Sequence, residues 1–199
     1  MTLDGHIMLA AHAMPQGRGY NWPTEDSSGG CFKDLTLNGK TILRAGSGTY
    51  CCGVTLEMFW RGWEGYAAEA KVPFMRGISV LQARQLQRAW FCVTGRKGAQ
   101  EALVPLGLGV AIDPKDARAG DFIQFWRKDG SGHSALLLSL ARGKLAYLST
   151  QRSTKGVGSR VEDAPPEIYV TRAASWARSA ARRDAGTYST DSLPIGRYE

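Results

Sequence analysis

The chain has 199 residues, a hydrophobic fraction of 43% and six tryptophans, which suffice to bury the core of one ordinary domain without metal or disulfide staples. Its apolar stretches fall far short of the ~20 residues that a membrane-spanning helix needs, so no membrane span is expected. The net charge of +7 favours an anionic partner, but the basic residues carry no aromatic interleaving, so nucleic acid is not the expected one.

Residues 1–48 are predicted to form a loop-rich N-terminal extension. Glycine, proline, serine and aspartate punctuate it, most densely between Pro23 and Gly30. Asn38-Gly39 between two apolar stretches predicts a short hairpin over residues 35–43. Residues 1–14 lack the basic region of a secretory signal. We therefore expect a cytoplasmic protein, a trimmed form of a longer chain, or export to the cell wall or periplasm by a signal-independent route.

Three helices are predicted after this extension. Apolar residues recur at helical spacing from Thr49 to about Gly65. A second helix is expected from Ser79 to about Val93, because Ser79-x-x-Gln82 forms a capping-box signature. A short third helix is predicted over residues 100–106. The side chains that the second helix is expected to direct into the core are Val80, Leu81, Leu86, Trp90 and Phe91.

The second half of the chain is predicted to consist of strands. Residues 122–126, 133–140 and 145–150 are apolar runs separated by polar turns, which predicts an antiparallel meander. Residues 168–170 are expected to add a strand. A closing helix over 173–183 and a mobile tail over 184–199 are predicted to follow. Helices followed by strands predict an α+β fold, built as a single domain over 1–199 with its core at 49–183.

Cys51 lies where a cysteine nucleophile is chemically favoured. Tyr50-Cys51-Cys52-Gly53 delivers two cysteines to the first turn of a predicted helix, where free N–H groups and the helix dipole stabilise a thiolate. The same N–H groups can donate to an oxyanion when a carbonyl is attacked. Two small cysteines that merely pack the helix would give the same pattern, and these residues alone do not choose between Cys51 and Cys52. The four cysteines lack metal-ligand spacing, so neither a metal nor a cofactor is predicted.

His133 is the candidate base. It is the only histidine outside the N-terminal dozen residues, and Gly132-His133-Ser134 opens an apolar strand, where the mouth of a site would lie. A thiol–imidazole pair needs a third group that orients the ring. Antiparallel pairing through a tight turn brings the end of the next strand beside His133. Gln151 is therefore predicted as the third residue, with Ser149 as the alternative.

Other residues are expected at the edge of this site. Asp121 is predicted to cap the turn before its strand and not to act as a base. Residues 154–158 are expected to be a flexible stretch that borders the site. The residues predicted to line the substrate are Tyr50, Cys52, Gly132, Ser134, Tyr20 and Trp22.

Three short motifs resemble those of NlpC-type cysteine peptidases. Cys51-Cys52-Gly53 is similar to the Cys-Ser-Gly that opens their catalytic helix. Residues 119–125 resemble their Pro-Gly-Asp-Leu-Val-x-Phe strand, and residues 132–138 resemble their His-Val-Gly-Ile strand. The related CHAP amidases place Glu-x-Asn on the following strand, which falls on residues 149–151. The motifs occur in the family's order, and the resemblance covers roughly residues 45 to 158.

The resemblance implies a papain-like core, with N-terminal helices packed on an antiparallel meander. Because the family nucleophile precedes Ser-Gly, that role carries over to Cys51, and Cys52 takes the serine position. The sequence departs from the family at Tyr50, where Asp is frequent, and at Gln151, where His, Asn or Asp is usual. These departures indicate a divergent member.

The resemblance further implies a hydrolase of bacterial cell walls, that is, an amidase or endopeptidase acting on peptidoglycan as a toxin, lysin or housekeeping enzyme. The positive charge fits an anionic wall polymer. We expect the protein to be a monomer. A protein that inhibits its activity could also exist. Two alternatives stay open: an acyl hydrolase or transferase on the same scaffold with a non-wall substrate, and a non-catalytic basic binding module with inert cysteines.

Overall fold

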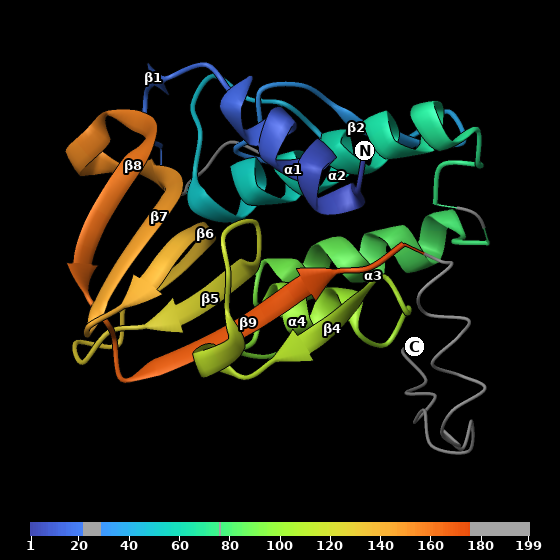
Figure 1. The fold of residues 1–199 in the computed structure, drawn as a ribbon. Coiled ribbons are helices and arrows are strands. Elements are labelled where there is room, and N and C mark those ends of the chain that lie inside the picture. The colour runs from blue at the N-terminus through green and yellow to red at the C-terminus, as the bar shows by residue number, and fades with distance from the viewer. Residues whose placement is uncertain (22–28, 76, 176–199) are drawn as a thin grey trace, which may run out of the picture.

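The computed structural model shows an α+β fold, in which helices pack against an antiparallel sheet (Figure 1). It describes residues 1–21, 29–75 and 77–175. Within these residues, seven strands form one sheet in the order β1-β8-β7-β6-β5-β9-β4, and each neighbouring pair is antiparallel. The strands are β1 (Gly17–Arg18), β4 (Gly109–Ile112), β5 (Phe122–Trp126), β6 (Gly132–Ala141), β7 (Lys144–Gln151), β8 (Gly156–Asp163) and β9 (Glu167–Ala173).

The predicted meander corresponds to β5, β6 and β7, and the structure confirms it. It continues into β8, which pairs with β7 from Lys144↔Asp163 to Gln151↔Gly156. The sequence prediction of a flexible stretch at 154–158 is therefore wrong. Its first residue, Thr154, ends the short 3-10 helix η2 (Arg152–Thr154), and its glycines, Gly156 and Gly158, lie at the start of β8. The predicted hairpin is confirmed as a separate pair of strands, β2 (Leu35–Leu37) and β3 (Lys40–Leu43).

The helix α2 (Cys51–Ala70) runs through the centre of the molecule and is longer than predicted. Its first ten residues are all buried, as expected for a helix with neighbours on every side. One neighbour is α1 (Leu3–His12), which lies alongside it (Figure 1). The expectation of a loop-rich N-terminus is wrong for this segment. A Cβ at Gly62 would lie 2.7 Å from the Ile7 Cα, so the glycine in α2 lets α1 approach closely. This packing stabilises α1, whose sequence has little helical periodicity of apolar residues.

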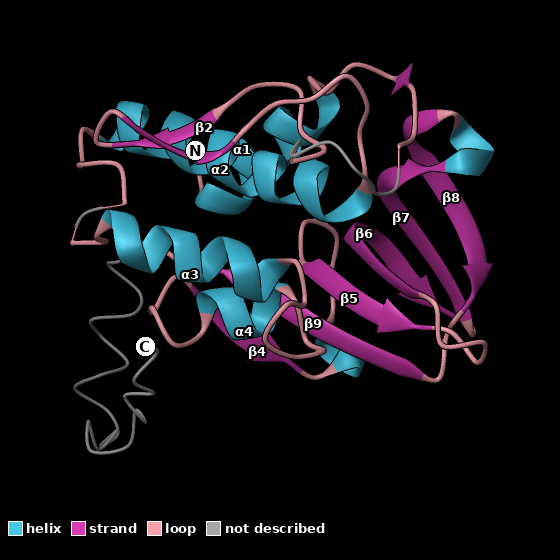
Figure 2. Ribbon diagram, turned by 180° about the vertical axis from the view of Figure 1, so that it is seen from behind, coloured by secondary structure: helices cyan, strands magenta, loops and turns pink. Residues whose placement is uncertain are grey.

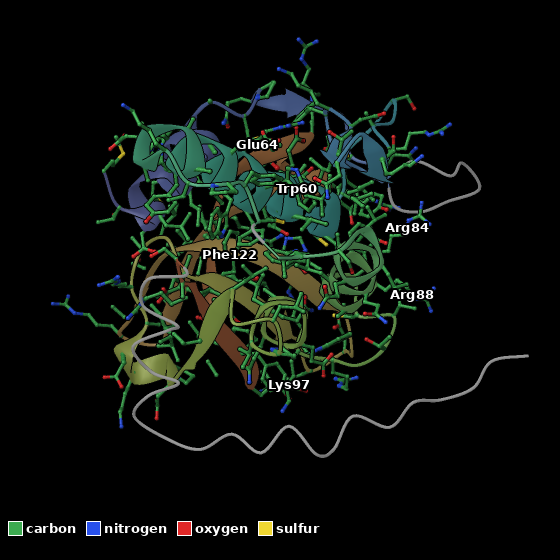
Figure 3. The ribbon with its side chains drawn as sticks, turned by 90° about the vertical axis from the view of Figure 1, so that its right-hand side faces the viewer. Trp60, Glu64, Arg84, Arg88, Lys97 and Phe122 are labelled. Atoms are coloured by element: carbon green, nitrogen blue, oxygen red, sulfur yellow. The ribbon has the colours of Figure 1, made fainter. Side chains whose placement is uncertain are left out.

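The helix α3 (Val80–Trp90) begins with the predicted capping box. The Ser79 hydroxyl accepts from the Gln82 N–H at 3.1 Å, and the Gln82 side chain accepts from the Ser79 N–H at 2.9 Å. Leu81, however, is 66% exposed, so its predicted place in the core is wrong. It falls on the outer side of the helix with Arg84 and Arg88, both labelled in Figure 3. The short helix α4 (Ala99–Leu103) and α3 lie near β4 and β9, away from β8 (Figure 2).

Two apolar clusters lie on opposite faces of the sheet, because successive residues of a strand point to opposite sides. Phe122 and Leu136 belong to the larger cluster with α2 and α3, in which the Phe122 and Trp90 ring centroids are 5.0 Å apart. The second cluster consists of Ile123, Phe125, Ala135, Leu137, Leu145, Tyr147 and Val170. In β6, Ser134 therefore points towards α2 and His133 towards the ring of Phe125.

Two predicted elements are not tested. Ala173, the first residue of the predicted closing helix over 173–183, belongs to β9, and residues 176–183 lie outside the described residues. The predicted tail over 184–199 lies wholly outside them. Among the helices that the structure describes, none has the length and apolar character needed to cross a bilayer. A 3-10 turn, η1 (Pro114–Asp116), precedes β5.

Candidate active site

Cys51 is the first residue of α2, and neighbouring backbone fixes its position. The Tyr50 N–H donates to the Gly30 carbonyl at 3.2 Å, and a Cβ at Gly53 would overlap the backbone of Gly29 and Gly30. The glycine of the Cys-x-Gly motif is therefore required by packing. Further along the helix, the Thr55 hydroxyl donates to the Cys51 carbonyl at 2.8 Å. The first turn of α2 is thus held by the loop at Gly29 and Gly30 and by a bond within the helix.

The strand β6 brings His133 to this helix start. The imidazole lies edge-on between two aromatic rings, with its centroid 5.5 Å from those of Phe125 and Tyr147. The side chain is buried, with 6% exposure. Its charge and hydrogen bonding are among the causes that lower the pKa of Cys51, so the ring lies beside that thiol. The structure therefore brings together the two residues that the sequence predicts as nucleophile and base.

The environment of Cys51 favours its thiolate. A hydrogen bond with the Cys52 thiol is the largest cause that holds the pKa of Cys51 well below the ordinary thiol value. Burial acts against this, but the charge and hydrogen bond of His133 and the backbone N–H of Ser134 add to the lowering. A thiolate is the reactive form of cysteine. The surroundings of Cys51 therefore favour the form that acts as a nucleophile.

The neighbouring thiol has the opposite behaviour. Its hydrogen bond with Cys51, reinforced by burial and by the Cys51 charge, raises the pKa of Cys52 well above the ordinary value. The two sulfur atoms are 3.8 Å apart, and the Cys52 sulfur lies 3.4 Å from the Ser134 hydroxyl. The two shifts therefore favour a thiolate on Cys51 and a protonated thiol on Cys52.

Gln151 lies where the strand register predicts it, but it does not contact the imidazole as expected. Continuing the Leu136↔Leu148 pairing of β6 and β7 to the strand ends sets Gln151 opposite His133. Its amide nitrogen instead donates to the Thr154 hydroxyl at 3.0 Å and the Gly158 carbonyl at 3.3 Å. These acceptors lie in η2 and β8, two elements that the sequence did not predict, and they compete with His133 for the Gln151 amide. Among the described residues, Gln151 Oε1 and His133 Nε2 are both buried without a hydrogen-bond partner.

Ser149, the alternative third residue, is used elsewhere. Its hydroxyl donates to the backbone carbonyl of Ser134 at 2.6 Å. That bond fixes β7 against β6 just beyond the last paired residues. Ser149 thus contributes to the framework that holds His133, without a hydrogen bond to the ring.

The segment around Tyr20 lies beside the helix start. The Asn21 N–H donates to the Thr49 backbone carbonyl at 2.9 Å. The Thr49 side-chain hydroxyl donates to the Gly19 carbonyl at 2.7 Å. Burial and then the Cys51 charge raise the pKa of Tyr20, and a parallel bridge pairs Tyr20 with Thr49. Because Cys51 is only 5% exposed, we infer that this segment covers the site.

The remaining predicted lining residues have mixed outcomes. Ser134 contacts Cys52, as described above. Tyr50 packs its ring edge-on against Phe91 at 5.7 Å. A Cβ at Gly132 would meet the Trp126 ring, so this glycine is explained by packing. Trp22 lies outside the described residues.

Sequence reasoning missed Gln124 and Tyr147. Gln124 accepts the Ser134 hydroxyl at 2.5 Å, and a polar residue inside the apolar run 122–126 was the available signal. Tyr147 packs on His133 and hydrogen-bonds Glu162 at 3.0 Å. Asp121 has the predicted capping role, because it accepts the Arg118 N–H at 2.9 Å. Within the described ranges, no group of three or more potential ligands is arranged to hold a metal ion.

No family model matches the sequence, and a search of curated proteins finds no significant match. The functional argument therefore rests on the geometry and electrostatics of the site.

Proposed function

We propose that the protein is a cysteine hydrolase that cleaves an amide or peptide bond, with Cys51 as the nucleophile and His133 as the proton carrier. The observation that carries the proposal is the convergence of Cys52, His133 and the Ser134 N–H on one sulfur, where all three favour the thiolate. A cysteine that only packs a core does not need this environment. Cys31 illustrates the contrast, since burial raises the pKa of its thiol to about 12.

The first half of the proposed reaction forms a thioester. The Cys51 thiolate attacks the carbonyl carbon, and the electron pair of the C=O bond moves onto oxygen, where N–H groups at the start of α2 can donate to it. When the tetrahedral intermediate collapses, the C–N bond breaks and His133 gives its proton to the leaving nitrogen. The amine product departs, and the acyl group remains on Cys51.

The second half hydrolyses the thioester. His133, now neutral, takes a proton from a water molecule as the water oxygen attacks the acyl carbon. The C–S bond then breaks, which releases the carboxylic acid and restores the thiolate beside a protonated His133. The packing of the ring between Phe125 and Tyr147 supports this role, because it limits imidazole motion between the two proton transfers.

Gln151 is proposed to orient His133 when substrate is bound. An amide oxygen and a ring N–H form a complementary acceptor and donor. Both candidates, Gln151 Oε1 and His133 Nε2, are buried without a partner among the described residues. A hydrogen bond between them would satisfy both groups and would fix the tautomer in which Nδ1 exchanges the proton.

Peptidoglycan is the proposed substrate class, and a papain-like core of the NlpC and CHAP type is the proposed fold relationship. Support comes from the three motifs and from the order of the elements, with the cysteine helix α2 ahead of the antiparallel strands β5, β6 and β7. The net charge of +7 suits an anionic wall polymer. A divergent wall amidase or endopeptidase is consistent with these features.

The test is digestion of purified peptidoglycan, with the released muropeptides identified by mass spectrometry. The wild type should release peptides or free a new amine, and Cys51→Ala and His133→Ala should each lower the rate by at least about 1,000-fold. Cys92→Ala is the matched control and should keep the wild-type rate. Release of the same products by Cys51→Ala would overturn the proposal.

A second probe separates the alternatives. If 4-nitrophenyl acetate acylates Cys51 while no muropeptide is released, the acyl chemistry stands and the substrate is a different amide or ester. If neither probe reacts at Cys51, the enzyme proposal fails and the basic binding module is favoured.

A further inference from the structure

Four polar side chains form a buried line from the sheet to the nucleophile. The Ser134 hydroxyl is 2.5 Å from the Gln124 side-chain oxygen, the Cys52 sulfur is 3.4 Å from the Ser134 hydroxyl, and the two cysteine sulfurs are 3.8 Å apart. All four side chains are buried, with exposures between 3% and 6%. Because buried polar groups need hydrogen-bond partners, Gln124, Ser134 and Cys52 depend on one another and on nearby backbone, while Cys51 also interacts with His133.

Counting protons gives the line a direction. The Gln124 amide nitrogen donates to the Phe125 carbonyl at 3.4 Å, which leaves its oxygen to accept from Ser134. The single hydroxyl proton of Ser134 is used in that bond, so the Ser134 oxygen faces Cys52 as an acceptor. Cys52 therefore has one proton and two acceptors within reach, the Ser134 oxygen and the Cys51 sulfur.

The charge on Cys51 decides where the Cys52 proton points. Hydrogen bonds to an ionised acceptor are roughly twice as strong as neutral ones, so a Cys51 thiolate draws the proton away from Ser134. When Cys51 carries an acyl group its charge is gone, and the proton can return to the Ser134 oxygen. A thiolate on Cys52 instead would face oxygen lone pairs, since Ser134 has no proton left to donate.

We infer that Cys52 is a positioning residue, which holds the negative charge on Cys51 by donating its S–H to that sulfur and which is itself kept from being the nucleophile by the Gln124–Ser134 pair. The inference rests on the proposed function for the role of Cys51 and adds how the site chooses between two adjacent thiols. The opposite pKa shifts of Cys51 and Cys52 agree with the donor role of Cys52. The hydrogen bond with Ser134 lowers the pKa of Cys52, but the bond with Cys51 and burial outweigh it. The donor role also explains what a cysteine can do at a position that the resemblance assigns to serine, because either side chain supplies one donor.

The experiment is the rate of Cys51 alkylation by iodoacetamide as a function of pH, read by peptide mass spectrometry on the full-length protein. In Cys52→Ala the profile should move to higher pH, with alkylation about tenfold slower near pH 6, as the loss of a hydrogen bond to a charged group implies. Cys52→Ser restores a donor and should keep the profile close to wild type. Cys92→Ala is the matched control and should not change it.

Two results would overturn the inference while leaving the proposed function intact. One is a Cys52→Ala profile that superimposes on an acidic wild-type profile, and the other is a Cys52→Ser profile displaced as far as that of Cys52→Ala. An ordinary alkaline profile for wild-type Cys51 would instead count against the proposed function itself.

Ser134→Ala provides a second test, which is needed if Cys52→Ala does not fold by circular dichroism. This change removes the competing acceptor, so the Cys51 profile should not move to higher pH. A displacement to higher pH would mean that Ser134, and not Cys52, supplies the stabilising proton, and the inference would be wrong.

Discussion

Replacing Asp121 by alanine tests whether this acidic residue, which precedes β5, has a structural role or a catalytic one. Asp121 is 1% exposed. Its carboxylate accepts two hydrogen bonds from Arg172, from Nε at 2.8 Å and from Nη2 at 2.9 Å, besides the Arg118 N–H. Because Arg172 lies in β9, these contacts attach that strand to the start of β5, which carries Gln124.

The expected loss of stability follows from the burial of this ion pair. Removing one partner of a buried pair costs about 3–5 kcal/mol, because the other charge is left uncompensated. The Arg172 side chain is 19% exposed, so water compensates it in part, and the lower end of about 3 kcal/mol is expected. In a domain of this size each 1 kcal/mol lowers Tm by about 2–4 °C, so Asp121→Ala should melt about 6–12 °C below the wild type.

The assay is thermal unfolding by circular dichroism, with Arg172→Ala and the double variant completing a cycle. The double variant should lose less stability than the sum of the single changes, because it leaves no unpaired charge. Below its melting temperature, Asp121→Ala should keep the wild-type pH profile of Cys51 alkylation. A variant with unchanged Tm and abolished Cys51 reactivity would refute the assignment of Asp121 to the turn.

Two further perturbations test the cover on the site and the buried thiols. A Cβ at Gly156 would overlap the Gly17 carbonyl oxygen, so Gly156→Ala should detach the β1 segment and speed alkylation of Cys51. Gly143→Ala, at a positive φ with no neighbouring atom within 4 Å, is the control, and equal rates in the two variants would contradict this role of the segment. Burial raises the pKa of the Cys31 thiol from 9.0 to about 12. Above pH 9 the unfolded chain therefore loses a proton that the folded chain keeps, and the free energy of unfolding should fall as the pH rises. Urea unfolding at pH 8 and pH 10.5 should show a smaller fall for Cys31→Ala, and an identical fall would contradict the burial argument.

Local sequence signals predicted much of the fold. The capping box at Ser79, the helical spacing after Thr49 and the turn at Asn38-Gly39 each specify backbone structure within a few residues, and the structure confirms them. The segments α1 and β8 were missed for a shared reason. Glycines in or against them permit close packing with α2 or with β1, and such packing partners are distant in the sequence.

The site was predictable to a smaller extent. A cysteine at a helix start and a histidine at a strand start can be found from sequence, and an antiparallel meander makes their meeting plausible. The hydrogen bonds of Gln151 could not be predicted, because they depend on Thr154 and Gly158 in a turn and strand that sequence reasoning treated as flexible. The link from Gln124 through Ser134 to Cys52 depends on strand register and on which face meets α2.

The most direct test of the central claim is a competition among the protein's own cysteines for iodoacetamide at about pH 6, mapped by peptide mass spectrometry. We predict that Cys51 is modified first, although Cys92 is the more exposed thiol, because burial raises the pKa of Cys92 to about 11. Modification of Cys92 ahead of Cys51, in both the wild type and the Gly156→Ala variant with its cover detached, would contradict the assignment of Cys51 as the nucleophile.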